Sequence, residues 1–450
     1  MQLLIVLLAL LASALAAPGP GATQQPTADH VVLISVDGFR PDFYLDEHWP
    51  APTIQQMARE GAHARAVSGV FPSVTYPSHT TVLTGALPAR HGIFYNTPFE
   101  PAGQTGRWYW EEAGIRVPTL WDAVRAAGRT SANLFWPVSV GAPVDHNVPE
   151  IWSLDRGADP IETIRRASTP GLLDELEREA SGRLTADEWS ADYLTRETLI
   201  GAMAAHLLET RKPALLTVHL IGTDHFQHEQ GRDGPMVRRA VGAVDRAIGQ
   251  MVDAAERAGI LDRTAFIITG DHGFVDIHTR LAPNVWLAEA GLTGADGDPW
   301  RARFHTSGAS AFLHLNRHPG QQATAQRVRE VLRSLPPGQQ RWFRVVERAE
   351  LDRIGADPSV PFALAPIPGV VFGAAAEGPA MEAASGATHG YFPDFPEIHT
   401  GFVGWGAGFR AGAVAPIIGL QDVAPIAAAL LGIPFQAPDG VLPMGLLAAP

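Results

Sequence analysis

The chain has 450 residues, of which 46% are hydrophobic and 18% are charged, so it can bury a large core and is not a disordered tail. Its formal net charge is −13 and it has no cysteine, which excludes disulfides, thiolate nucleophiles, cysteine-ligated zinc and iron–sulfur clusters. The acidity argues against binding of a nucleic acid polymer, because neutralising its phosphates takes an excess of basic side chains. Any metal would be held by His, Asp, Glu or hydroxyl groups, and a phosphate substrate would need such metal ions.

The first sixteen residues are uncharged and apolar, and they end in Ala14-Leu15-Ala16, the small-x-small pattern of a signal-peptidase site. They predict a signal peptide at residues 1–16, followed by a Pro/Gly/Thr-rich spacer at residues 17–28. About 15 apolar residues fall short of the roughly 20 that span a bilayer, so we expect a periplasmic or secreted protein without a transmembrane anchor. The segment lacks Lys and Arg, which leaves an uncleaved anchor as the alternative.

Three apolar runs predict buried parallel strands, and each run ends at an acidic turn. The runs are residues 31–36, 214–221 and 264–269, and the turns contain Asp37, Asp224 and Asp271. Helical spacing of apolar residues at 118–128, 195–211 and 235–258 alternates with these strands. The alternation predicts a doubly wound α/β sheet, in which ligands bind beyond the carboxyl ends of the strands.

Residues 276–380 interrupt this pattern with Pro/Gly-rich stretches, a strand candidate at 309–315 and an Arg-rich helix candidate at 322–334. Sheet-like sequence returns at 398–404, and a final helix is expected near 420–431. We therefore expect one catalytic domain over residues 29–450, with an inserted cap-like region at about 276–380.

Six side chains at or near the predicted strand ends are candidate metal ligands. Three carboxylates and three imidazoles suit two mixed nitrogen and oxygen sites, and this ligand set favours zinc over magnesium. The six residues are Asp37, Asp224, His228, Asp271, His272 and His389. Scattered surface residues could imitate part of the pattern, but their repeated placement at strand ends favours metal ligation.

Thr75 is the candidate nucleophile. It lies just ahead of a predicted helix, whose free N–H groups favour an anionic oxygen. A threonine hydroxyl is a poor nucleophile alone, and a divalent metal can activate it without a Ser-His-Asp arrangement. A plain turn residue is the alternative for Thr75.

These motifs resemble the nucleotide pyrophosphatase/phosphodiesterase family of the alkaline phosphatase superfamily. The resemblance rests on VDGFRPDF, FPSVTYPSHTTVLTGALPARHGI, GTDHFQH, TGDHGF, THGY and LQDVAPIAAALLGIP. It covers most of residues 30–275 and 385–440 and is weak or absent through residues 276–380. It implies an alkaline-phosphatase-like three-layer α/β sandwich with a mostly parallel central sheet.

The resemblance also implies roles for individual residues. One zinc ion would be bound by Asp37, Thr75, Asp271 and His272, and the second by Asp224, His228 and His389. Asn96 would hydrogen-bond a phosphate oxygen, and Tyr76 would contact the leaving group or base. In-line attack by Thr75 would give a phosphothreonine intermediate, which water then hydrolyses.

Departures from related enzymes favour a diesterase. Sulfatases carry C/S-x-P-x-R, whereas this chain has Thr75-Tyr76-Pro77-Ser78-His79, and threonine cannot become formylglycine. Alkaline phosphatases resemble the metal core but use a serine nucleophile and a third metal, for which the sequence has no convincing counterpart. The expected substrate is a small phosphodiester or nucleotide, cleaved to release a nucleoside monophosphate.

Three other functions stay open: a phospholipase-C-like or choline phosphodiesterase acting on lipid head groups, a phosphomonoesterase of the same superfamily, and a binding protein with a decayed site. The last predicts a broken ligand set, but all candidate positions are filled. Packing roles are favoured for the remaining histidines and aromatic residues near the motifs. These are His79, His219, His225, Trp108, Tyr109 and Trp110.

Overall fold

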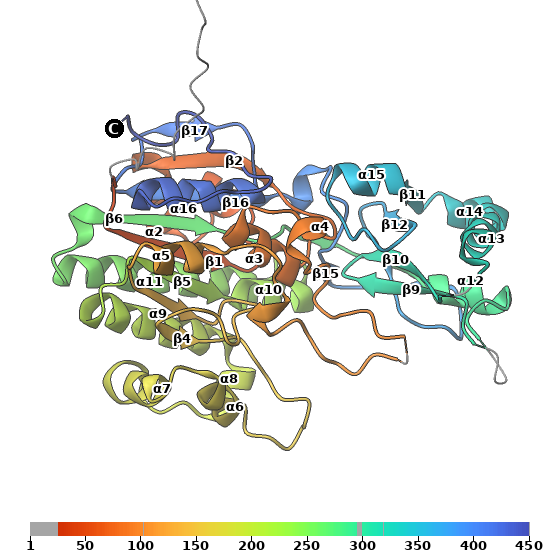
Figure 1. Cartoon of the computed structure of the whole chain (residues 1–450), viewed down its shortest axis with the longest axis horizontal. Helices are drawn as coiled ribbons and strands as arrows, with labels where there is room; N and C mark the ends of the chain where they lie inside the picture. Colours follow the sequence, from red (N-terminus) through yellow and green to blue (C-terminus); the bar gives the residue numbers. More distant parts are fainter. Residues whose placement is uncertain (1–25, 102, 295–298, 318, 450) are drawn as a thin grey trace, which may run out of the picture.

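The computed structural model describes residues 26–101, 103–294, 299–317 and 319–449 (Figure 1). The predicted signal peptide at 1–16 and residues 17–25 of the predicted spacer lie outside these ranges. None of the helices in the described ranges is both long enough and apolar enough to cross a bilayer.

A nine-stranded sheet forms the centre of the larger part of the molecule (Figure 1). Its strand order is β17-β2-β16-β6-β1-β5-β3-β4, with β18 also paired to β2. The three strands predicted before the acidic turns are neighbours and run parallel, in the order β6-β1-β5. Strand β16 runs antiparallel to both β6 and β2. The strands are β1 (His30–Val36), β2 (Ala62–Ser68), β3 (Ser131–Leu134), β4 (His146–Val148), β5 (Leu215–Leu220), β6 (Thr264–Thr269), β16 (Thr400–Gly406), β17 (Ala413–Ala415) and β18 (Ile418–Gly419).

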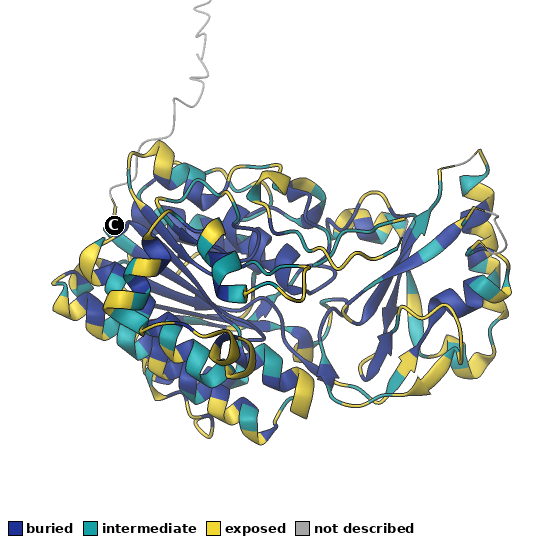
Figure 2. Cartoon of the chain, turned by 90° about the horizontal axis from the view of Figure 1, so that it is seen from below, coloured by how far each residue is buried: buried dark blue, intermediate teal, exposed yellow. Residues whose placement is uncertain are grey.

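Helices cover both faces of this sheet because successive residues of its buried strands point to opposite sides. Val32 and Ile34 face a core built with α2 (Pro52–Glu60), α9 (Tyr193–Thr210) and α11 (Pro235–Arg257). Val31 and Leu33 face the other core, built with α3 (Thr75–Thr84), α5 (Leu120–Ala126) and α16 (Val423–Leu431). Figure 2 shows the buried strands between outer helices that expose one face. The predicted three-layer α/β sandwich is therefore present.

Shorter helices connect these layers. They are α1 (Asp42–Leu45), α4 (Pro88–His91), α6 (Pro160–Ala167), α7 (Leu172–Leu176), α8 (Ala186–Ala191) and α10 (Gly222–Gln230). Of these, α10 follows β5 directly and begins with the acidic turn that contains Asp224.

The predicted insertion forms a second lobe with its own hydrophobic core, on the right of Figure 1. Its antiparallel sheet has the order β11-β12-β10-β9, and the predicted strand and helix of this region are β10 and α13. The elements are β9 (Ala302–Ser307), β10 (Ser310–Leu315), β11 (Phe343–Glu347), β12 (Phe362–Pro366), α12 (Pro283–Glu289), α13 (Gln321–Ser334), α14 (Pro337–Gln340) and α15 (Arg348–Arg353).

Two small sheets join the lobes. One has the order β13-β8-β14, and the other pairs β15 with β7. Their strands are β7 (Val275–Asp276), β8 (Thr279–Leu281), β13 (Val370–Phe372), β14 (Met381–Ala383) and β15 (Ala387–Thr388). The β15–β7 pair returns the chain to the edge of the central sheet where the acidic turns lie.

Candidate active site

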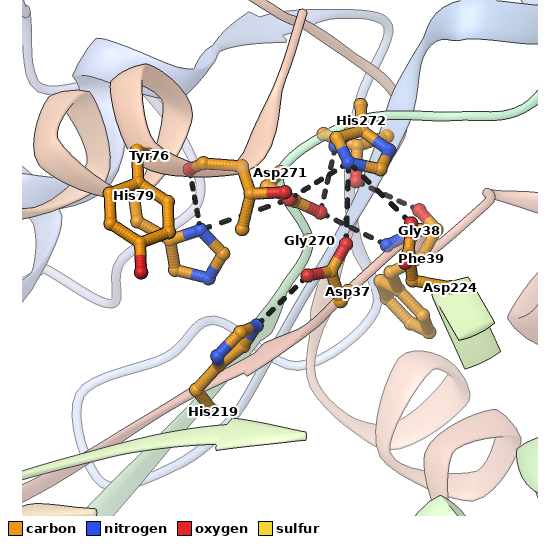
Figure 3. Close-up of polar contacts among 12 residues, drawn as sticks. Asp37, Gly38, Phe39, Tyr76, His79, His219, Asp224, Gly270, Asp271 and His272 are labelled. Atoms are coloured by element: carbon orange, nitrogen blue, oxygen red, sulfur yellow. Dashed lines mark hydrogen bonds and ion pairs between the residues drawn. The ribbon is translucent and has the colours of Figure 1, made fainter. Parts of the chain in front are cut away.

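The acidic turns meet because their parent strands are adjacent and parallel. Asp37 follows β1, Asp271 follows β6, and Asp224 lies in the first turn of α10 after β5. The Gly38 backbone N–H donates to Asp271 Oδ1 at 3.0 Å, which ties the β1 turn to the β6 turn (Figure 3). The expectation that these carboxylates gather at one edge of the sheet agrees with the structure.

Two groups of side chains have ligand atoms within 4.8 Å of one another. The first is Asp224, His228 and His389, the set that the family resemblance implied for one metal. The second is Asp37, Asp224 and His272, so Asp224 lies between the two groups. Asp271 adjoins the second group, since its Oδ2 atom is 3.1 Å from His272 Nε2.

Backbone carbonyls orient all three candidate imidazole ligands. The Nδ1 atoms of His228, His272 and His389 lie 3.0, 3.2 and 3.1 Å from the carbonyl oxygens of Ala387, Gly273 and Ser73. A carbonyl oxygen only accepts, so each Nδ1 carries the hydrogen and each Nε2 keeps its lone pair. This is the usual orientation of metal-binding histidines.

Four candidate ligand atoms in this region are buried, and no hydrogen-bond donor among the described residues reaches them. They are Asp37 Oδ1, Asp224 Oδ1, Asp271 Oδ2 and His272 Nε2. Burial, together with repulsion by Asp271 and Asp224, raises the pKa of the Asp37 carboxyl. Buried polar atoms rarely lack a partner, and a divalent cation would both occupy these atoms and offset the repulsion. The residues present therefore fit a metal centre.

Thr75 is the first residue of α3, and it lines the same cavity as Asp37 and Asp224. The side chain of Asn96 is held beside this helix start, because its Oδ1 accepts a hydrogen bond of 2.9 Å from the Tyr76 backbone N–H. The Asn96 amide group keeps its own N–H donors for a ligand oxygen. The structure thus brings the predicted nucleophile and phosphate-binding residue together with the candidate metal ligands.

A chain of hydrogen bonds that the sequence analysis did not predict lies behind Asp37. His219 of β5 contacts Asp37 Oδ2 through Nε2 at 3.1 Å (Figure 3). Its Nδ1 atom contacts Glu150 Oε2 at 3.0 Å. The Tyr76 hydroxyl donates to Glu150 Oε1 at 2.7 Å. Burial alone would lower the pKa of His219, but the hydrogen bonds to Asp37 and Glu150 raise it to about 10.

Sequence reasoning assigned His219 only to the core of a strand. It is indeed buried there, with 1% of its surface exposed. The available signal was the pair of polar residues, Thr217 and His219, on one face of an otherwise apolar strand. Glu150 gave no such signal, because it is 69 residues from His219 and follows a loop.

The cavity beside these residues has a volume of about 410 Å³, and both aromatic and charged side chains line it. Trp108 packs against Tyr76 and Trp152, with ring centroids 5.1 and 4.8 Å apart. Trp189 and Tyr193 form another part of the wall. A packing role was favoured for Trp108 over a place in a substrate-facing aromatic wall, yet Trp108 lines this cavity, whereas Trp110 is buried behind Trp152.

The inserted lobe supports His389. The turn between β9 and β10 packs on the loop after β15, where the Ala309 backbone N–H donates to the His389 carbonyl at 2.8 Å. Gly308 makes this contact possible, since its φ is +54° and an added Cβ would lie 2.6 Å from the His389 oxygen. The inserted region therefore positions a candidate ligand, and it lies within the residues that the family model matches, although its sequence had been expected to show little family resemblance.

Comparisons with known proteins agree with this architecture. Murine ectonucleotide pyrophosphatase/phosphodiesterase 5 superposes with a TM-score of 0.68 at 19% identity, covering 93% of this chain and 100% of that one. A second structure of that protein, an inactive threonine-to-alanine variant in complex with AMP, has a TM-score of 0.65 and covers 91% of this chain and 96% of that one. The fold is that of the alkaline-phosphatase-like α/β proteins.

The type I phosphodiesterase/nucleotide pyrophosphatase family matches residues 31–392, and the chain belongs to this family. Human ectonucleotide pyrophosphatase/phosphodiesterase family member 7 is 27% identical over 287 residues, which cover 61% of this chain and 55% of that protein. Human family member 5 is 26% identical over 261 residues, covering 55% of this chain and 46% of that protein. The chain thus spans about half the length of the curated relatives that it matches.

Proposed function

We propose that the protein is a phosphodiesterase and nucleotide pyrophosphatase that uses two zinc ions and releases a nucleoside monophosphate. The observation that carries the proposal is the meeting of buried ligand atoms without hydrogen-bond donors at three adjacent strand ends, beside a cavity that Asp37, Thr75 and Asp224 line. Three carboxylates and three imidazoles suit zinc, and Thr75 lies where a nucleophile can reach a bound phosphate.

The proposed ligand sets follow the family pattern. Asp37, Thr75, Asp271 and His272 would hold one ion, while Asp224, His228 and His389 would hold the other. Asp224 lies within reach of both groups, so it also couples the two sites. When bound, the ions supply Lewis-acid stabilisation of phosphoryl oxygens and lower the pKa of a coordinated hydroxyl or water.

The protein's own groups would then perform an in-line displacement. Thr75 Oγ1 attacks phosphorus from the start of α3, a helix N-terminus whose dipole favours the developing negative charge. The amide group of Asn96 donates to a phosphoryl oxygen, and Tyr76 contacts the departing group or base. A phosphothreonine diester remains until water attacks from the opposite side and restores the Thr75 hydroxyl.

Two further observations support this reading. In the murine relative, the variant described as inactive lacks a threonine and binds AMP, a nucleoside monophosphate. The apolar segment at residues 1–16 supports export to the periplasm or the medium, where the cysteine-free chain needs no disulfide.

A second candidate function is hydrolysis of choline phosphate diesters. The observation in its favour is the aromatic part of the cavity wall that Trp108 and Trp152 form. Faces of such rings attract a quaternary ammonium group by about 0.5–2 kcal/mol each. The same rings can also stack on a nucleobase, so the substrate must be decided by assay.

The deciding experiment compares p-nitrophenyl thymidine monophosphate and ATP with p-nitrophenyl phosphorylcholine on purified, zinc-loaded protein. We expect hydrolysis of the two nucleotides, with activity lost in EDTA and restored best by zinc. Hydrolysis of the choline ester alone would replace the first function by the second.

Thr75→Ala and Thr75→Ser test the nucleophile. The alanine variant should lose turnover, and mass spectrometry should no longer detect the covalent phosphothreonine intermediate. It should still bind zinc through the six other ligands. The serine variant retains a hydroxyl and should keep measurable activity. Undiminished turnover in Thr75→Ala would refute the assignment.

A further inference from the structure

Among the described residues, each charged side chain that lines the active-site cavity has a polar partner or is a candidate metal ligand, with one exception. Glu150 accepts from His219 and the Tyr76 hydroxyl, and Asp37 also contacts His219. Asp224 lies 3.4 Å from His228. Glu229 lies 3.3 Å from His225.

Arg196 is the exception. It lines the same cavity, but no carboxylate of the described residues lies within ion-pair distance of its guanidinium. Its Nε atom is buried and has no acceptor among the described residues. Burial lowers the pKa of this guanidinium, and Glu150 and Glu197 attract it only from longer range. An unpaired charge at a buried wall is costly unless a ligand supplies the counter-charge.

Aromatic packing holds the guanidinium in one place. Arg196 Cζ lies 4.0 Å from the ring centroid of Trp189 and 5.8 Å from that of Tyr193. Trp189 is itself buried, with 5% of its surface exposed. A planar fork fixed against an indole ring loses little entropy on binding, and its donors match the oxygens of a phosphate.

Arg196 lies on α9, and this helix packs against α10, which carries Asp224. The next residue, Glu197, accepts hydrogen bonds from the backbone N–H groups of Ile221 and Gly222 at the start of α10. In an in-line displacement the leaving group departs opposite the attacking oxygen. Since Thr75 attacks from α3, the leaving group departs toward the α10 side of the cavity.

We infer that Arg196 binds a second phosphate of the substrate, on the leaving side of the scissile bond, and so favours pyrophosphate bonds over simple diesters. The inference rests on the proposed function. The Thr75 Oγ1 to phosphorus bond forms while the bond to the bridging oxygen breaks. The electron pair stays on the leaving phosphate, whose added charge Arg196 offsets, and the Thr75 proton passes to solvent. A cationic choline group on this side would be repelled by the same guanidinium.

The test compares two substrates that share a nucleoside and a scissile phosphate and differ only in the leaving group. These are thymidine triphosphate and p-nitrophenyl thymidine monophosphate. Arg196→Met removes the charge and keeps an unbranched chain over Trp189, and Arg196→Lys keeps the charge without the fork. Arg238→Met is the matched control, because Arg238 stacks on Trp49 at 5.0 Å and does not line the cavity.

We expect Arg196→Met to lower kcat/KM for the triphosphate about 30-fold or more, and at least about tenfold more than for the ester. Arg196→Lys should fall between wild type and Arg196→Met, and Arg238→Met should leave the ratio of the two substrates unchanged. Equal losses on both substrates, no loss on either, or a wild-type enzyme that cleaves only the ester would overturn the inference. If Arg196→Met does not fold, a wild-type substrate ratio in Arg196→Lys would overturn it as well. Cleavage of neither substrate by wild type would instead refute the proposed function.

Discussion

Replacing His219 with leucine would test whether this buried histidine holds Asp37, a proposed metal ligand, in place. Leucine is close to histidine in size but donates no hydrogen bond. The substitution removes the contacts of 3.1 Å to Asp37 and 3.0 Å to Glu150. Glu150 keeps the hydrogen bond from the Tyr76 hydroxyl. Asp37 loses its side-chain donor on the Oδ2 atom, next to the repelling carboxylates of Asp271 and Asp224.

Two magnitudes follow from this geometry. Removing one partner of a buried charged pair typically costs 3–5 kcal/mol, so the metal-free variant should be less stable by about that amount. Losing a hydrogen-bond partner behind a metal ligand typically weakens metal affinity about 10–100-fold, which corresponds to about 1.4–2.7 kcal/mol. Zinc affinity should therefore fall together with stability.

The assay is urea unfolding of the metal-free protein, followed by competition with a zinc chelator. His225→Leu is the matched control, because His225 lines the same cavity but pairs with the exposed Glu229 and does not touch Asp37. The His225→Leu variant should lose less than about 1 kcal/mol of unfolding free energy, as is usual when an exposed ion pair is removed. The role assigned to His219 is wrong if His219→Leu loses no more stability or zinc affinity than His225→Leu.

Three further predictions follow. Gly308→Ala should lower the free energy of unfolding, measured in urea, by at least about 1 kcal/mol and should weaken zinc binding. The new methyl group would clash with the loop that carries His389, and the left-handed backbone conformation of residue 308 disfavours alanine. Gly338→Ala is the control, because residue 338 lies in the same lobe and a methyl group there meets open space; it should change neither stability nor zinc binding. Equal effects in both variants would contradict the role of Gly308 in supporting the loop of His389. Burial lowers the pKa of His91 to about 3 in the folded protein, so this side chain binds a proton more readily in the unfolded protein. The free energy of unfolding that neutral His91 contributes is therefore complete above pH 6.5 and declines as the pH falls toward 3. When the pH falls from 7 to 5, the free energy of unfolding of the wild type should therefore drop by about 2 kcal/mol more than that of His91→Gln. Identical drops in the two proteins would contradict the assignment. Chelation of bound metal should lower the melting temperature of the protein. Zinc at 100 times its Kd should then restore about 2.7 kcal/mol of unfolding free energy per site. A melting temperature that does not respond to chelator or zinc would argue against a metal centre.

Much of the central architecture could be predicted from sequence because its elements follow local rules. The runs at 31–36, 214–221 and 264–269 correspond to β1, β5 and β6, and the helix expected at 235–258 is α11. Continuous apolar runs and helical periodicity report on burial within one segment, which is why these elements were recognisable. The metal and catalytic roles of the individual residues stay predictions, although the structure brings the candidate ligands together beside the cavity that Thr75 lines.

The contacts behind the site could not be predicted, because they join residues far apart in the chain. Glu150 meets His219 across 69 residues. Ser73 meets His389 across 316 residues. No periodicity or motif encodes such pairs, and the insertion gave no hint that Gly308 would pack on the loop of His389.

By itself the sequence determined which chemical groups are available: no thiol, a net negative charge, and carboxylates and imidazoles at the ends of buried strands. Strand direction then requires these groups to meet at one edge of a parallel sheet. Only the tertiary structure decided which polar groups pair and which stay unpaired, because pairing depends on distances between separate segments. It left Arg196 without a carboxylate beside the acidic cavity, and this guanidinium provides the test of substrate preference.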